Sequence, residues 1–254
     1  MHIDLTGKQA VVGGSTGGIG RTIAEGLARA GPAVVINGRG EQRVARALSE
    51  MRGGIPGAEL EGVAVLVGRA PTADILVNNV GTAVPKPFEE LEDADWLDLF
   101  QLNVMSGVHL TRHYLPAMVK KGWGRVVFIS SESAVNIPKE MINYGMTKTA
   151  QLAISRGVAE SVAGSGVTVN SVLPGPTRSE GIGRFLGAAA ERAGVTQEVI
   201  EQQFLETLRP TSLIGRFATT EEVANMVVYL CSEQASATTG AALRVDGGVV
   251  RFIA

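Results

Sequence analysis

Residues 10–20 read Ala-Val-Val-Gly-Gly-Ser-Thr-Gly-Gly-Ile-Gly, and this stretch decides the fold class of the chain. A short apolar run leads directly into a glycine-rich turn, and a helical pattern begins at Ile19. Glycine permits the positive φ angles of a tight turn and lets an anion approach the backbone. The N–H groups and dipole of the next helix favour a phosphate there. The stretch predicts a nucleotide-binding βα unit rather than a merely flexible turn.

Along the rest of the chain, short β-branched runs alternate with longer stretches at helical spacing. The apolar runs are residues 10–12, 33–36, 63–65, 75–77, 125–129, 167–169 and 242–245, and the helical stretches include 19–30, 96–120, 144–163 and 221–230. Continuously apolar runs are typical of strands buried on both faces. The alternation predicts an α/β fold, a doubly wound parallel sheet of about seven strands with helices on both faces. We expect one domain over residues 1–254, with an irregular insertion at about 177–217 that holds two helices.

The composition excludes several classes of protein. The chain has 254 residues, a formal net charge of −2 and 45% hydrophobic residues, and its 32 glycines follow no collagen-like period. Near-neutral charge argues against nucleic-acid binding. Its single cysteine, Cys231, excludes an intramolecular disulfide and a cysteine-rich zinc site. No run approaches the roughly 20 apolar residues of a membrane span, and a signal-peptide pattern is lacking. We expect a cytoplasmic protein with no nucleic-acid or membrane partner.

Tyr144 and Lys148 lie four residues apart on a predicted helix, so their side chains share one face. A nearby ammonium lowers the pKa of a tyrosine, which is ordinarily about 10. Such a pair can exchange a proton with a substrate oxygen near neutral pH. Ser131 follows the run at 125–129, at the sheet edge where open α/β sheets bind ligands, and its hydroxyl can hold the reacting oxygen. The alternative for Tyr144 and Lys148 is an exposed helix pair.

The end of the second apolar run predicts the cofactor. Dinucleotide folds use a carboxylate here to hold the ribose 2′-hydroxyl of NAD, or an arginine to hold the 2′-phosphate of NADP. No aspartate or glutamate occurs at residues 36–40, where Gly38 leaves room and Arg39 supplies a positive charge. The sequence therefore favours NADP, with NAD possible. The alternative for Arg39 is a solvated loop residue.

Seven segments together resemble the short-chain dehydrogenase/reductase (SDR) family over nearly the whole chain. They are 14–20 (GSTGGIG), 78–81 (NNVG), 102–104 (LNV), Ser131, 144–148 (YGMTK), 174–177 (PGPT) and 245–248 (VDGG). The resemblance implies a Rossmann domain that transfers a hydride between a nicotinamide and an alcohol or ketone. It implies Tyr144 as acid/base, Ser131 as orienter of the substrate oxygen, Lys148 as ribose ligand and modifier of the Tyr144 pKa, and Asn103 as holder of a relay water. It also implies a homotetramer or homodimer.

The resemblance, with Arg39, assigns the residues that contact the cofactor. They are Gly14, Ser15, Thr16, Gly17, Gly18, Ile19, Gly20, Arg39, Asn79, Val80, Gly81, Tyr144, Lys148, Pro174, Gly175 and Thr177. Glu132, Met141 and Ile142 lie near Ser131 or Tyr144 in the sequence and are candidate substrate-lining residues, with packing as the alternative. No metal is expected, because His109 and His113 share a helix face but have no third ligand nearby.

Between Gly14 and Asn78 the chain is shorter than the family pattern. A complete helix before the fourth strand is lacking, and no carboxylate follows residues 63–65 until Asp74. We therefore expect thin cover on one sheet face and weak cofactor binding. A non-catalytic nucleotide-binding scaffold is one alternative function, and a 3-oxoacyl-carrier-protein reductase-like enzyme is another. The long insertion at 177–217 favours a small ketone, sugar or ring alcohol as substrate.

Overall fold

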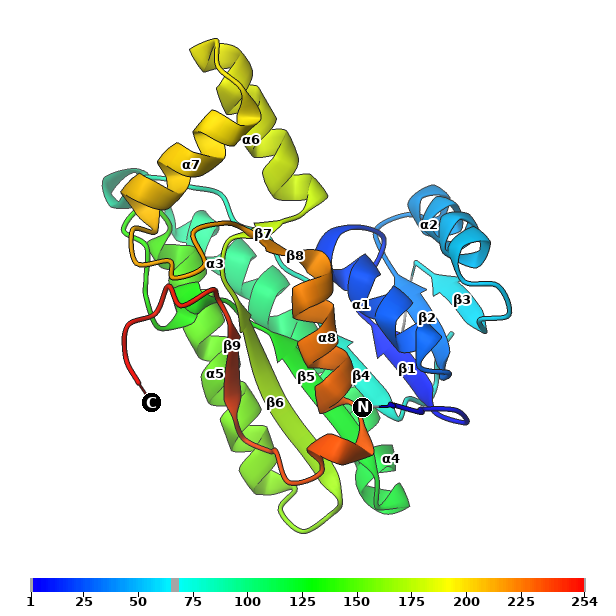
Figure 1. Cartoon of the computed structure of the whole chain (residues 1–254). Helices are drawn as coiled ribbons and strands as arrows, with labels where there is room; N and C mark the ends of the chain where they lie inside the picture. Colours follow the sequence, from blue (N-terminus) through cyan, green and yellow to red (C-terminus); the bar gives the residue numbers. More distant parts are fainter. Residues whose placement is uncertain (1, 65–68, 254) are drawn as a thin grey trace.

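The computed structural model describes residues 2–64 and 69–253. In this part of the chain, parallel strands form one seven-stranded sheet (Figure 1). They are β1 (Gln9–Val12), β2 (Ala33–Asn37), β3 (Leu60–Val63), β4 (Ile75–Asn78), β5 (Gly124–Ile129), β6 (Val167–Pro174) and β9 (Ala242–Val245). The order across the sheet is β3-β2-β1-β4-β5-β6-β9, so β1 lies between β2 and β4. Sheets of this kind bind ligands at the carboxyl edge of such a switch point. The predicted fold class is confirmed.

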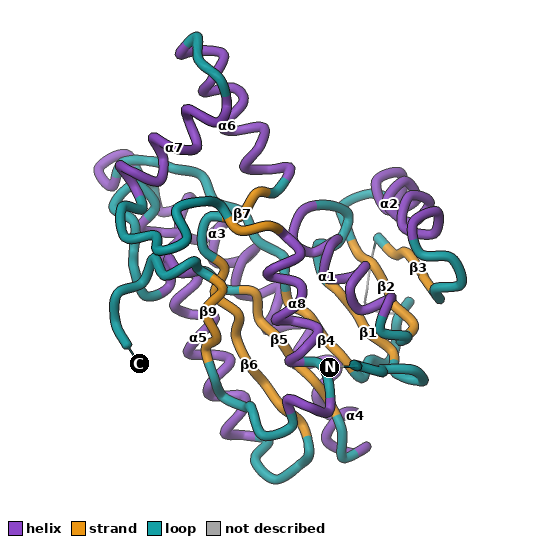
Figure 2. Tube along the Cα trace, in the orientation of Figure 1, coloured by secondary structure: helices purple, strands orange, loops and turns teal. Residues whose placement is uncertain are grey.

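Helices cover both faces of the sheet (Figures 1 and 2). One face packs against α1 (Gly18–Arg29), α2 (Glu41–Gly54) and α8 (Thr220–Leu230), and the other against α4 (Ser106–Lys121) and α5 (Ile142–Ser161). Neighbouring strand residues therefore enter different cores: Val12 packs in the first cluster and Val11 in the second. This double burial explains why the apolar runs are continuous.

The third strand begins earlier than the sequence predicted. β3 ends at Val63, Ala64 lies in a bend, and residues 65–68 of the predicted run and its continuation lie outside the described residues. Val34 pairs with Leu60 at one end of β3, and Asn37 pairs with Val63 at the other. β3 is an edge strand whose Glu61 is exposed, so it lacks the continuous apolar pattern on which the prediction relied.

The connection from β3 to β4 is short, and its described residues, 64 and 69–74, contain no helix. Val35 and Val63 on this face are nevertheless only 1% and 4% exposed. They belong to one cluster with Ala70 and with Tyr114 of α4. The buried Tyr114 hydroxyl donates a hydrogen bond to the Ala70 carbonyl oxygen at 2.8 Å, which ties the short connection to α4.

A wide turn interrupts the helix that the sequence predicted over residues 96–120. α3 (Asp93–Phe100) continues into a π-helical segment, η2 (Gln101–Met105), and then into α4. A π turn adds a residue to the helical repeat without a sequence signature. Such turns are frequent at functional sites, and this one contains Asn103.

The insertion at 177–217 holds the two expected helices, α6 (Glu180–Ala193) and α7 (Gln197–Leu208). Two short parallel strands, β7 (Thr177–Arg178) and β8 (Ala218–Thr219), bring its ends together. Figures 1 and 2 show α6 and α7 as an arm that stands beyond the end of the sheet. Leu186, Leu205 and Phe217 give the arm a small core of its own. Within residues 2–64 and 69–253, three short helical turns are also present: η1 (Phe88–Glu90), η3 (Glu132–Ala134) and η4 (Glu233–Ala235).

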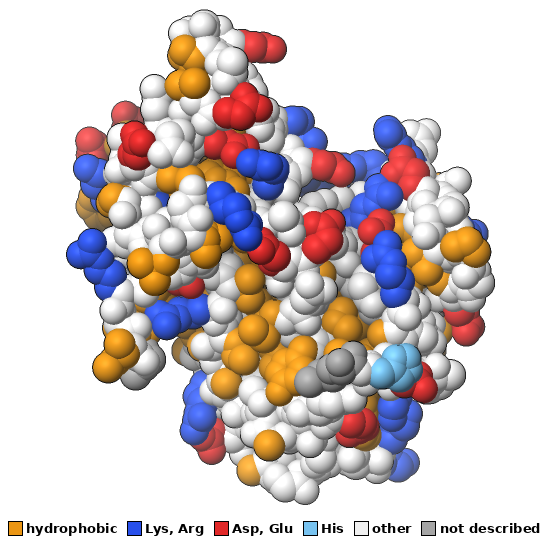
Figure 3. All heavy atoms as spheres, in the orientation of Figure 1, with side chains coloured by type: hydrophobic (Ala, Val, Ile, Leu, Met, Phe, Trp, Pro, Cys, Tyr) orange, Lys and Arg blue, Asp and Glu red, His pale blue; other side chains and the backbone are white. Residues whose placement is uncertain are grey.

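The surface carries charges of both signs. On the face drawn in Figure 3, lysine and arginine side chains are interspersed with aspartate and glutamate. Over residues 2–64 and 69–253, no helix is long and apolar enough to cross a bilayer.

We predict that Tyr114→Phe lowers the free energy of unfolding by about 1–2 kcal/mol, because it leaves the buried Ala70 carbonyl without its donor. Urea unfolding followed by circular dichroism measures this change. Tyr229→Phe in α8 is the matched control, because the Tyr229 hydroxyl has no hydrogen bond to another described residue; we expect a change within about 0.5 kcal/mol. Equal losses in both variants would show that the Tyr114 hydroxyl does not secure the connection.

Candidate active site

A cavity of about 710 Å³ opens at the carboxyl edge of the sheet, below the arm. Its walls come from the start of α1, from the segments that follow β4, β5 and β6, and from α5, α6 and α7. Of the residues singled out in the sequence, it is lined by Ile19, Asn79, Gly81, Ser131, Glu132, Met141, Tyr144, Lys148, Pro174, Gly175 and Thr177. The fold thus brings the glycine-rich turn, the Tyr144–Lys148 pair and Ser131 to one space. Ile142 begins α5 beside it and is not among its lining residues.

The glycine-rich turn closes tightly against the end of β4. Gly14 and Gly18 have φ angles of +62° and +55°, in the left-handed region. Asn79 Nδ2 donates to the carbonyl oxygens of Gly13 and Gly14, each at 3.1 Å. A Cβ on Gly20 would lie 2.3 Å from Asn79 Nδ2 and 2.5 Å from the Gly14 oxygen. The turn itself therefore requires glycine at position 20, independently of any ligand.

The turn is also suited to an anion. At Gly17 the nearest group is the Glu180 carboxylate, whose Oε2 lies 3.3 Å from the position of a Cβ. This carboxylate is an anion that lies beside the N-terminus of α1, and the N–H groups and dipole of that helix end favour a phosphate at the same place. Gly38 packs closely on Thr16, since a Cβ on Gly38 would lie 2.4 Å from Thr16 Cγ2, and the next residue is the exposed Arg39. The residues present therefore fit a dinucleotide with its diphosphate at the turn.

Lys148 is buried in α5, with 4% of its surface exposed. Its Nζ donates to the Ile129 carbonyl oxygen at 2.9 Å and to Gln151 Oε1 at 3.2 Å. Gln151 Nε2 in turn donates to the backbone carbonyl oxygen of Asn103 at 2.6 Å. Both hydrogen-bond partners of the ammonium are neutral, and burial lowers the pKa of Lys148 to about 8.

Asn103 is fully buried, and its side chain hydrogen-bonds both to the segment that follows β4 and to α5. Its Oδ1 accepts from the Thr82 N–H at 2.9 Å, and its Nδ2 donates to the Thr82 carbonyl at 2.9 Å and to Thr147 Oγ1 at 3.1 Å. The relay water that the resemblance implied on Asn103 stays a prediction; in the structure the Asn103 carbonyl oxygen accepts from Gln151, and its second lone pair can still accept a hydrogen bond. Sequence reasoning missed Gln151, although a polar residue three positions after Lys148 on the same helix face was a usable signal.

Tyr144 lies next to Lys148 and Ser131. The Lys148 Nζ is 5.6 Å from the centre of the Tyr144 ring, and Ser131 Oγ is held by the Ser133 N–H at 3.1 Å. Burial raises the pKa of Tyr144 to about 12, while its hydrogen bond with Ser131 lowers it. The expectation that Lys148 lowers this pKa below 10 is wrong here, because the loss of hydration outweighs the other effects. The hydroxyl therefore keeps its proton at neutral pH.

A buried ion pair forms part of the cavity wall. Arg209, at the end of α7, donates through Nε to Glu132 Oε1 at 2.8 Å, and the two side chains are only 6% and 4% exposed. The Ser133 hydroxyl donates to the same oxygen at 3.3 Å. Burial raises the pKa of the Glu132 carboxyl, and the Arg209 charge opposes this shift. Arg209 escaped the sequence analysis because 77 residues separate it from Glu132 and no local pattern links them.

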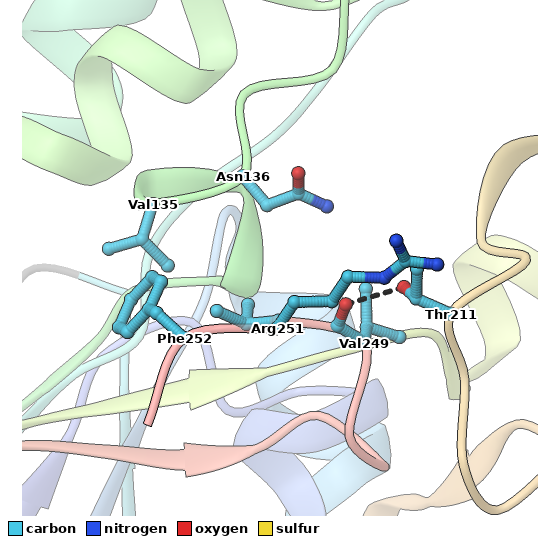
Figure 4. A pocket seen from close by; sticks show the side chains of 7 residues that line it. Val135, Asn136, Thr211, Val249, Arg251 and Phe252 are labelled. Carbon is cyan, nitrogen blue, oxygen red and sulfur yellow. Dashed lines mark hydrogen bonds between the residues drawn. The ribbon is translucent and has the colours of Figure 1, made fainter. Parts of the chain in front are cut away.

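A second hollow, of about 480 Å³, lies beside the C-terminal segment. It is lined by Val135, Asn136, Thr211, Val249, Val250, Arg251 and Phe252. Figure 4 shows the Arg251 side chain extending toward Thr211. Since this lining offers no tyrosine, lysine or carboxylate side chain, it holds no acid–base pair. Among the described residues no group of three histidine, cysteine, aspartate or glutamate side chains could hold a metal ion.

Comparison with known proteins places this geometry in a family. A family model described as Enoyl-(Acyl carrier protein) reductase matches residues 14–250. The uncharacterized oxidoreductase YvaG of Bacillus subtilis is 44% identical over 263 residues, covering 100% of both chains. The chain belongs to the short-chain dehydrogenase/reductase family. The YvaG alignment exceeds the 254 residues of this SDR protein, so YvaG contains residues that this chain lacks.

Two further relatives have assigned activities. The 3-oxoacyl-[acyl-carrier-protein] reductase FabG of Aquifex aeolicus is 35% identical to this SDR protein, over 98% of this chain and 100% of its own. The crystal structure of L-sorbose reductase from Gluconobacter frateurii, complexed with NADPH and L-sorbose, superposes with a TM-score of 0.93. It is 31% identical and covers 100% of both chains. This SDR protein is therefore an oxidoreductase.

We predict that Gly20→Ala lowers the free energy of unfolding by about 1–3 kcal/mol, because the new methyl group overlaps Asn79 and the Gly14 carbonyl. Chemical unfolding measures the change. Gly53→Ala in α2 is the control, since a Cβ there meets nothing within 4 Å; we expect stabilisation of about 0.5–1 kcal/mol. A Gly20→Ala protein as stable as the parent would contradict the close packing of the turn.

Proposed function

We propose that the protein is an NADP-dependent oxidoreductase that transfers a hydride between the nicotinamide and a small alcohol or ketone. The observation that carries this proposal is the single cavity in which Ile19 at the end of the glycine-rich turn meets Ser131, Tyr144 and Lys148. The bound NADPH and L-sorbose of the similar reductase support both the cofactor and a small ketone.

In this proposal the cofactor supplies the hydride, and the protein supplies position and charge. Residues 14–20 hold the diphosphate at the start of α1, and Arg39 holds the 2′-phosphate that distinguishes NADP from NAD. The glycine at position 81 leaves room beside the catalytic lysine, since a Cβ there would lie 3.3 Å from Lys148 Nζ. Pro174 and Gly175 at the end of β6, and Thr177 at the start of β7, line the cavity on the nicotinamide side.

Tyr144 donates the proton when a ketone is reduced. Its pKa of about 12 keeps the hydroxyl protonated at neutral pH, and Ser131 donates a second hydrogen bond to the reacting oxygen. The Lys148 ammonium stabilises the tyrosinate that remains after proton transfer. The ammonium exists below its pKa of about 8, so ketone reduction is favoured at neutral pH.

A second candidate is a 3-oxoacyl-carrier-protein reductase, which the FabG relative favours. Both candidates use the same proton donor, so they differ only in the group that binds beyond the reacting carbonyl. A non-catalytic scaffold is a weaker candidate, because Ser131, Tyr144 and Lys148 all line the cavity.

We predict that Tyr144→Phe lowers kcat/KM for ketone reduction by about 10²- to 10⁴-fold, the usual contribution of a general acid. NADPH oxidation in the presence of ketones gives the rate, and a fluorescence titration with NADPH shows whether the cofactor still binds. Tyr229→Phe, distant from the cavity, is the control. If Tyr144→Phe is as active as the parent, or no ketone is reduced, the proposal is wrong.

We predict that kcat/KM for reduction falls as the pH rises past about 8, because Lys148 then loses its positive charge. Gln151→Leu removes an acceptor from the ammonium, so the pKa of Lys148 falls and the decline begins at lower pH. Gln151→Glu places a carboxylate beside the ammonium, so the decline begins at higher pH. Rates measured from pH 6 to about 10 test the order. Identical profiles in all three proteins would show that Gln151 does not position Lys148.

A further inference from the structure

We propose that Arg209 and Glu132 are positioning residues for the reaction, and that their buried ion pair fixes the turn carrying Ser131 to the end of the arm. Proton donation by Tyr144 then depends on the arm being docked over the cavity. This role rests on the proposed function and adds to it a connection between the arm and the proton donor.

The turn that carries Ser131 is attached to α5 on one side. Ser131 directly precedes η3, and its Oγ accepts from the Ser133 N–H at 3.1 Å. The Ala134 carbonyl oxygen, at the other end of η3, accepts from Thr149 Oγ1 of α5 at 2.7 Å. Since α5 also carries Tyr144, these bonds set the turn against the helix of the proton donor.

On the other side the same turn is attached to the arm. Glu132 Oε1 accepts from Arg209 Nε at 2.8 Å and from Ser133 Oγ at 3.3 Å. Arg209 Nη1 donates to the Leu208 carbonyl oxygen at 2.7 Å, which holds the guanidinium against the end of α7. Ser133 thus bonds to Glu132 through its hydroxyl and to Ser131 through its N–H. A shift of the arm end is therefore passed on to the Ser131 hydroxyl.

Stability alone is a poor explanation for this ion pair. The Arg209 and Glu132 side chains are both buried, and Glu132 Oε2 has no hydrogen-bond partner among the described residues. Taking two charges out of water costs about as much as their attraction returns, so a buried ion pair is weak evidence for stability. What the pair does supply is a fixed geometry between the arm and the turn.

The pair also balances the charge near the proton donor. Burial and the hydrogen bond with Ser131 have the largest effects on the pKa of Tyr144; of the nearby charges, Glu132 raises this pKa and Arg209 lowers it. The two charges oppose each other at Tyr144 while both are present. Loss of either partner leaves one uncompensated charge near the donor.

A second ion pair in the same region provides a matched control. Arg178 Nη2, in β7, donates to Glu201 Oε2 of α7 at 2.6 Å. The Arg178 side chain is largely exposed, and neither residue is among those that line the cavity. Arg178→Gln therefore disturbs the attachment of α7 without touching the link to Ser131.

The test measures reduction by NADPH in Glu132→Gln, Arg209→Gln, the double variant and Arg178→Gln. The ketone is whichever of L-sorbose, 2-hexanone and acetoacetyl-coenzyme A the parent reduces fastest. A fluorescence titration with NADPH counts the folded sites, and kcat is expressed per site.

We expect each single variant of the pair to lower kcat about 10- to 100-fold, the usual cost of a small misplacement, while the Kd for NADPH stays within about 2-fold. The double variant should lose no more than the single variants, because the two partners act as a unit. Arg178→Gln should keep the parent kcat, because exposed ion pairs contribute little.

Arg209→Lys guards against misfolding, since it keeps a cation for Glu132 and leaves no buried charge unpaired. We expect it to be clearly more active than the double variant, in which the pair is absent.

The inference is overturned, and the proposed function stands, if the variants of the pair keep the parent kcat or if their losses multiply in the double variant. The same holds if Arg178→Gln loses as much kcat as Arg209→Gln, or if Arg209→Lys is no more active than the double variant. If the parent reduces none of the three ketones, the proposed function is overturned and this inference with it.

Discussion

The site depends on one buried lysine ammonium whose hydrogen-bond partners among the described residues are both neutral. Lys148 is 4% exposed, and its hydrogen-bond partners are the Ile129 carbonyl and the Gln151 amide. Burial of a charge is tolerable only where polar groups surround it at fixed positions. The end of β5 provides one of these groups, the Ile129 carbonyl oxygen. The other is Gln151 Oε1, and the Gln151 amide is held in turn by the Asn103 carbonyl oxygen in the π turn. The π turn between α3 and α4 therefore helps to position Gln151 and, through it, Lys148.

Other hydrogen bonds fix the two halves of the cavity. On the cofactor side, Asn79 binds the glycine-rich turn to the end of β4. On the substrate side, Arg209 binds the end of α7 to Glu132, next to Ser131. The short connection from β3 to β4 lies outside this arrangement and is secured separately by the Tyr114 hydroxyl. The groups around Tyr144 hold their places although the described residues of this connection, 64 and 69–74, contain no helix.

Local patterns in the sequence were sufficient for the sheet, the glycine-rich turn and the Tyr144–Lys148 pair, because each depends on residues that are neighbours in the chain. They failed where tertiary contacts decide. β3 is an edge strand, so its exposed Glu61 breaks the apolar pattern. A single position, Gly20, was interpreted through a ligand, whereas contacts with Asn79 and Gly14 already require glycine. Arg209 and Glu132 meet only because the arm folds back over the sheet edge.

The proposed reaction is a hydride transfer to a carbonyl carbon, with Tyr144 supplying the proton. The most direct measurement reduces a ketose with NADPH that carries deuterium at both C4 positions, followed by mass spectrometry of the product alcohol. We expect one deuterium in the product, bonded to the new carbinol carbon. A product without deuterium, or no reduction of any ketone, would contradict it.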